Sequence, residues 1–108
     1  MLDNNSKSCA GPGYASPKDA IKAPREKVVY TICIYTGTGI EKPDYLATID
    51  VDENSSTYGE IIHRTELGVV GDELHHMGWN ACSSCNTDGS MERKYLIIPG
   101  VRTSNFYI

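Results

Sequence analysis

The sequence predicts a mainly β protein, and three observations support this fold class. Short segments rich in β-branched and aromatic residues recur along the chain. Clusters of Gly, Pro, Asn and Asp separate them, as they separate the strands of all-β domains. The length of 108 residues suffices for one domain with a modest core and is too short for two.

Residues 1–24 are predicted to form an irregular N-terminal arm. Gly and Pro interrupt this region, and its apolar residues recur at no regular period. We expect a short helical turn at 16–21, because Ser16 can cap it and Pro17 suits the first helical position.

Residues 25–108 are predicted to contain the strands. The expected strand segments are 27–35, 44–51, 58–64, 94–98 and 105–108. A long segment without periodicity separates the third from the fourth, and in compact domains such segments are usually functional or disordered. The chain ends in the apolar run Phe106–Ile108, so we expect it to be truncated at its C-terminus.

Composition and charge exclude several classes of function. The net charge of -4 comes without a basic cluster, which argues against binding to nucleic acid or to a membrane through a polybasic anchor. No apolar run approaches the roughly 20 residues of a spanning helix. The N-terminus lacks the pattern of a signal peptide, so we expect a cytosolic protein with reduced thiols.

One segment concentrates the groups that can carry chemistry. Residues 72–85 read D-E-L-H-H-M-G-W-N-A-C-S-S-C and hold two of the three histidines, two of the four cysteines and the only tryptophan. Their apolar residues follow neither a helix nor a strand period, so packing alone does not explain the segment. We expect Trp79 to pack under this loop and hold it in one conformation.

The pair Cys82 and Cys85 forms a C-x-x-C motif with three interpretations. The two thiols can ligate a metal, act as a redox pair or be structural. A zinc ribbon would need a second C-x-x-C, and a thioredoxin-type site would need a βαβ pattern; neither is present. The motif alone does not decide among the three.

The adjacent residues His75 and His76 are the second candidate group. Neighbouring side chains diverge in both strands and helices, so we expect one metal ligand, with Asp72 or Glu73 supporting it in the second shell. The alternative is a pair of ordinary surface histidines. Imidazole together with thiolate favours zinc or copper over magnesium or calcium.

Several strings in the chain resemble the N-terminal region of the selenium-binding protein family, whose members include methanethiol oxidases. The resemblance runs from about residue 9 to residue 108. It is carried by C-A-G-P-G-Y at 9–14, A-P-R-E at 23–26, P-D-Y-L-A-T-I-D-V-D at 43–52, I-H-R at 62–64 and the string at 72–85.

The resemblance implies a fold, a reaction and partners. The family fold is a β-propeller with blades of roughly 40–45 residues, so residues 25–108 would form its first one to two blades and be incomplete as a domain. Family enzymes oxidise methanethiol with oxygen and water to formaldehyde, hydrogen sulfide and hydrogen peroxide, using copper. Members are associated with the cytosol, the nucleus and peripheral membranes.

The resemblance also implies roles for individual residues. His75 and His76 match the family's histidine pair and would be catalytic copper ligands, while Cys82 and Cys85 would bind selenium or carry redox chemistry. The family often has a selenium-linked cysteine where this chain has Gly59, which argues against selenium binding there. Three hypotheses follow: a thiol oxidase, a selenium or metal carrier without turnover, and a truncated chain with neither activity.

Overall fold

The computed structural model describes residues 13–81 and 92–108 and confirms the mainly β class. The chain divides into two compact units, one comprising 1–24 and 79–95, the other 25–78 and 96–108. Among the described residues, no helix has the length and apolar character needed to cross a membrane. The elements are α1 (Pro17–Ala20), β1 (Val28–Cys33), β2 (Tyr45–Asp50), β3 (Ile61–Glu66), β4 (Gly78–Trp79), β5 (Leu96–Pro99) and β6 (Phe106–Tyr107).

The helix α1 is the single turn expected from the sequence. Ser16 has an extended backbone, and its Oγ accepts a hydrogen bond from the Asp19 N–H at 3.3 Å and donates one to Asp19 Oδ2 at 2.6 Å. Pro17 occupies the start of the helix, where its missing N–H costs no hydrogen bond. The cap and the proline therefore act together as predicted.

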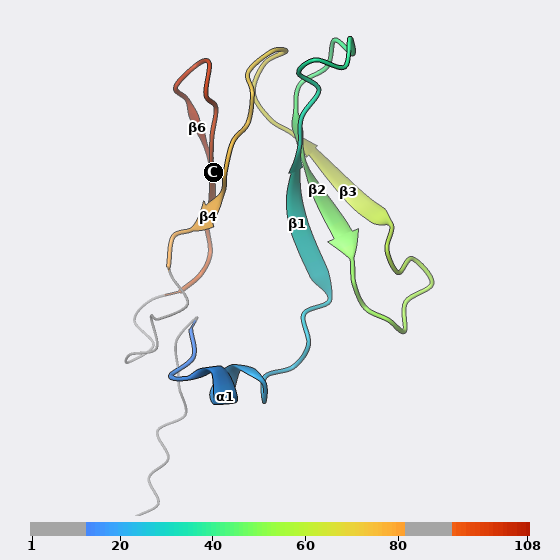
Figure 1. Cartoon of the computed structure of the whole chain (residues 1–108), viewed down its shortest axis with the longest axis vertical. Coiled ribbons are helices and arrows are strands. Elements are labelled where there is room, and N and C mark those ends of the chain that lie inside the picture. The colour runs from blue at the N-terminus through green and yellow to red at the C-terminus, as the bar shows by residue number, and fades with distance from the viewer. Residues whose placement is uncertain (1–12, 82–91) are drawn as a thin grey trace, which may run out of the picture. The chain divides into compact units, whose positions relative to one another are not determined.

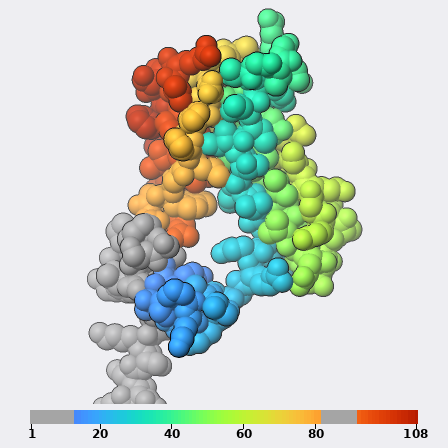
Figure 2. Space-filling view, viewed as in Figure 1, coloured from blue at the N-terminus to red at the C-terminus, as the bar shows by residue number. Residues whose placement is uncertain are grey.

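Strands β1, β2 and β3 lie side by side in one antiparallel sheet (Figure 1). The β1–β2 register runs from Val28 opposite Asp50 to Cys33 opposite Tyr45. The β2–β3 register shifts between Thr48 and Ile49, as at a β-bulge. Every residue of β3 is exposed, and Figure 2 shows the strand in yellow-green at the surface.

The third strand begins later than the sequence predicts, at Ile61 instead of residue 58. Asp50 organises the connection before it: the Gly59 N–H donates to the Asp50 carbonyl at 2.8 Å, and Thr57 Oγ1 donates to Asp50 Oδ2 at 2.6 Å. Gly59 has a φ of 82°, a conformation that favours glycine. These contacts hold the residues before Ile61 in a turn and delay the strand.

The second sheet has the order β4–β5–β6. Strands β5 and β6 pair antiparallel, with Ile98 opposite Tyr107 and Pro99 opposite Phe106, near the predicted fourth and fifth strands. The two-residue strand β4 was not predicted, because it is too short to show any alternation of apolar and polar residues. The sequence-predicted aperiodic segment therefore contains a short strand.

The core of the described chain is small and includes buried carboxylates. Among the described residues of the larger unit, its buried apolar residues are Tyr45, Ala47, Leu74 and Ile98. Asp44, Asp50 and Asp72 are buried as well, although aspartate is seldom fully buried without partners. Within the described part of the chain, no buried side-chain nitrogen or oxygen lacks a hydrogen bond. The carboxylates are thus part of the packed interior.

Asp72 ties its own loop to the chain around β6. Thr103 donates to it twice, from N–H to Oδ1 at 3.1 Å and from Oγ1 to Oδ2 at 2.8 Å, and the Tyr107 hydroxyl donates to Oδ2 at 2.6 Å. Gly100 passes so close that an added Cβ would lie 2.7 Å from Asp72 Cγ. The hydrogen bond from Tyr107, with those from Thr103, lowers the pKa of Asp72.

We expect Leu74→Ala to lower the free energy of unfolding by about 2–5 kcal/mol, because it leaves a cavity at a side chain that is 1% exposed. Val69→Ala is the matched control: Val69 is 58% exposed, and its loss should change stability by less than about 0.5 kcal/mol. Urea unfolding followed by circular dichroism measures both. Equal losses would show that Leu74 is not a core residue.

Stability should fall in acid as the buried aspartates gain protons. Hydrogen bonds from Ser55 and Thr57 lower the pKa of Asp50, and that from Tyr107 lowers the pKa of Asp72. Their contribution is therefore complete above the unfolded pKa of about 3.9 and is lost as pH falls through the lower folded values.

Removing a donor should shift this transition to higher pH. Thr57→Val and Tyr107→Phe each take one hydrogen bond from a charged carboxylate, so each folded pKa rises and unfolding begins at a less acidic pH. Tyr58→Phe, at a residue that is 61% exposed, is the control. Acid titration followed by circular dichroism should separate the two variants from the control; coincident curves for all three would contradict this account.

Candidate functional site

The histidine-bearing segment lies alongside β5 in a strand-like pairing. Leu74 forms an isolated antiparallel bridge with Gly100, and the His75 N–H donates to the Pro99 carbonyl at 3.0 Å. The Val101 N–H donates to the Glu73 carbonyl at 2.9 Å. Extended backbone sends successive side chains to opposite sides, so Leu74 is buried while His75 is exposed.

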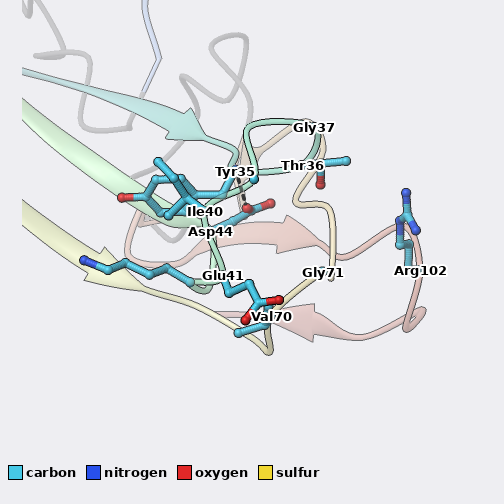
Figure 3. A pocket seen from close by; sticks show the side chains of 11 residues that line it. Tyr35, Thr36, Gly37, Ile40, Glu41, Asp44, Val70, Gly71 and Arg102 are labelled. Carbon is cyan, nitrogen blue, oxygen red and sulfur yellow. Dashed lines mark hydrogen bonds between the residues drawn. The ribbon is translucent and has the colours of Figure 1, made fainter.

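Asp44 holds the same segment from the other side. It is 2% exposed, and its two carboxylate oxygens accept from two backbone N–H groups, Oδ1 from Tyr35 at 2.8 Å and Oδ2 from Leu74 at 3.0 Å. Figure 3 shows the Asp44 side chain directed at Tyr35. Asp44 was not among the predicted site residues, since an aspartate at the start of a strand is typical of a turn.

The side chains of His75 and His76 lie against each other. Their ring centroids are 4.8 Å apart with an interplanar angle of 78°, an edge-to-face contact. The expectation that adjacent side chains diverge does not describe them, because His76 has a φ of 54° and the backbone turns there. Both residues are exposed, so a small molecule can reach both rings.

Glu73 contacts the histidine pair through its carboxylate. Its Oε1 lies 3.6 Å from Nε2 of His75, and its Oε2 lies 3.9 Å from Nη2 of Arg102. Glu73 therefore contacts His75, as its expected supporting role requires, whereas the side chain of Asp72 contacts Thr103 and Tyr107.

Trp79, Cys82 and Cys85 are the remaining residues that the sequence singles out. Trp79 is 39% exposed and belongs to the other compact unit. Cys82 and Cys85 lie outside the described residues, so the C-x-x-C motif remains a prediction from the sequence.

The imidazole pair fits a metal such as copper or zinc only in part. Two neutral imidazoles are suitable donors for either ion. Residues 13–81 and 92–108 contain no group of three or more His, Cys, Asp or Glu side chains that could hold a metal ion. In the described chain, His75 and His76 thus provide donors but not a complete ligand set.

A cleft of about 300 Å³ opens beside Asp44 (Figure 3). Its walls combine apolar and charged side chains, including Tyr35, Ile40, Val70 and Arg102. Glycines in the surrounding loops, Gly37 among them, have positive φ and leave open space where a side chain would otherwise stand. No sequence motif indicated this cleft, because three separate loops contribute to it.

Comparison with known proteins identifies close relatives. The chain is 58% identical over 101 residues to a protein named methanethiol oxidase from Xenopus laevis, covering 94% of this chain and 21% of that protein. It is 51% identical over 109 residues to selenium-binding protein 2 from Arabidopsis thaliana, covering 99% and 22% respectively. The chain therefore spans about a fifth of the length of these curated relatives.

A solved structure and a family model agree with these relatives. The crystal structure of a hypothetical selenium-binding protein from Sulfolobus tokodaii matches with a TM-score of 0.77 and 52% identity, covering 87% of this chain and 21% of that one. The model of the 56 kDa selenium-binding protein family matches residues 8–108. This chain belongs to the 56 kDa selenium-binding protein family.

Proposed function

We propose that this chain supplies the histidine-bearing part of a thiol-oxidising site in a methanethiol oxidase. The observation that carries the proposal is its identity of 57–58% to Xenopus proteins of that name, across 94% of the chain. We propose, too, that its sheets belong to the first blades of a β-propeller, since antiparallel sheets of three strands suit incomplete four-stranded blades.

The proposed reaction converts methanethiol, dioxygen and water to formaldehyde, hydrogen sulfide and hydrogen peroxide. The methyl carbon loses two electrons and gains a carbonyl oxygen, while its bond to sulfur breaks. Dioxygen takes up the two electrons and two protons as peroxide. Copper, when bound, would supply the electron transfer between the thiol and dioxygen.

The residues of this chain would bind the metal and orient its ligands. The imidazole nitrogens of the exposed residues His75 and His76 are the proposed metal donors, and the contact between the two rings limits how far either can rotate. The Glu73 carboxylate, 3.6 Å from His75 Nε2, would orient the His75 ring from outside the metal. The buried Leu74 anchors the backbone between them.

We expect His75→Ala in the full-length protein to lower kcat/KM for methanethiol by at least about 100-fold, since even residues that only support a ligand cost 10–100-fold. His63→Ala is the matched control: His63 is the third histidine, exposed on β3, and its removal should leave turnover near the wild-type value. Sulfide and peroxide release are the measurements. Wild-type turnover in His75→Ala would refute the assigned role.

The second candidate function is a selenium carrier without turnover, which the names of the Arabidopsis relatives favour. It predicts stoichiometric selenium uptake that Cys82→Ser or Cys85→Ser reduces to the background level. Cys33→Ser is the control, because Cys33 lies in β1. Selenium content by mass spectrometry measures uptake, and peroxide release from methanethiol by the same preparation would exclude a pure carrier.

A further inference from the structure

We propose that Asp44 is a positioning residue that sets the conformation of the His75–His76 pair. The inference rests on the proposed function in one respect: it treats this pair as the reactive group of the site. Asp44 acts on the pair through the backbone of Leu74, whose N–H donates to Asp44 Oδ2.

The contacts of Asp44 bring three separate parts of the chain together. Its side chain accepts from the Tyr35 N–H after β1 and from the Leu74 N–H before the histidines. Its own backbone carbonyl accepts from the Leu67 N–H at 3.0 Å. A buried carboxylate with a backbone donor on each oxygen has little freedom to move, because moving away from either donor leaves that oxygen without a hydrogen bond.

The histidine pair depends on this anchor because it fixes the peptide just before the two histidines. Asp44 fixes the N–H of Leu74, and Pro99 fixes the N–H of His75 on the adjacent peptide. The next residue, His76, has a positive φ of 54°, which non-glycine residues adopt only where surrounding contacts maintain it. Loosening Leu74 would therefore allow the backbone at His76 to relax and the two rings to separate.

The other nearby carboxylates do not perform this task. The Asp72 side chain accepts hydrogen bonds from Thr103 and Tyr107, and Glu73 contacts His75 at the end of a flexible side chain. The hydrogen bond from the Leu74 N–H joins the residue just before the histidines to the Asp44 side chain, directly before β2. The geometry assigns the positioning role to Asp44.

The test compares Asp44→Asn with Asp50→Asn in the intact protein. An asparagine at 44 retains the size of aspartate, but its amide NH₂ faces a backbone N–H and so loses one of the two hydrogen bonds. Asp50 is the matched control: it is also a buried, hydrogen-bonded aspartate, and it lies at the opposite end of β2.

Two readouts distinguish positioning from general stability. The first is NMR of the protein without added metal: Asp44→Asn should move the ¹³Cα signal of His76 and the ring signals of both histidines, whereas Asp50→Asn should leave them in place. The second is kinetics, in which Asp44→Asn should lower kcat for methanethiol by about 10–100-fold with little change in KM.

Each outcome bears on a different claim. Unchanged histidine signals in Asp44→Asn, or equal changes in Asp50→Asn, would overturn the positioning role. Absence of sulfide release by the wild-type protein would refute the proposed function, while the NMR comparison would still decide the role of Asp44. If Asp44→Asn does not fold, hydrogen exchange in the wild-type protein decides: a Leu74 amide as protected as those of β2 supports the role, and rapid exchange overturns it.

Discussion

Buried carboxylates, more than a large apolar core, fix the loops of this protein. Asp50 closes the turn between β2 and β3, Asp72 joins its loop to the residues around β6, and Asp44 joins three loops at the start of β2. Each accepts hydrogen bonds from donors on other segments. An apolar contact has no direction, whereas these hydrogen bonds fix particular peptide groups, so the loops gain defined conformations.

This arrangement makes stability and site geometry depend on the same chemistry. A buried carboxylate that keeps all its donors is tolerated, but one that loses a donor is costly because a charged oxygen remains unpaired. Tyr45 shows the same use of polar contacts: its ring packs under the Arg64 guanidinium at 4.8 Å, and a hydrogen bond to the Cys33 group and burial raise its pKa. Polar groups in the described interior are therefore held by specific partners.

The sequence predicted features that depend on neighbouring residues and missed those that depend on distant ones. The β-branched runs located β1 and β2, and Ser16 with Pro17 located α1, because these signals are local. The late start of β3 follows from hydrogen bonds to Asp50, which no pattern within residues 58–64 reveals. Asp44 reads as a turn residue, and its partner Leu74 lies thirty positions along the chain.

The histidine pair illustrates why residue type alone does not give site geometry. Two adjacent histidines in a regular strand would face opposite ways, and neither position is a glycine that would signal a positive φ. The positive φ of His76 brings the rings into contact at a conformational cost that only neighbouring contacts can offset. Hydrogen bonds to Asp44 and Pro99 anchor the backbone N–H groups of Leu74 and His75, directly before the bend at His76. The rigidity of this short stretch therefore determines whether the two imidazoles stay together.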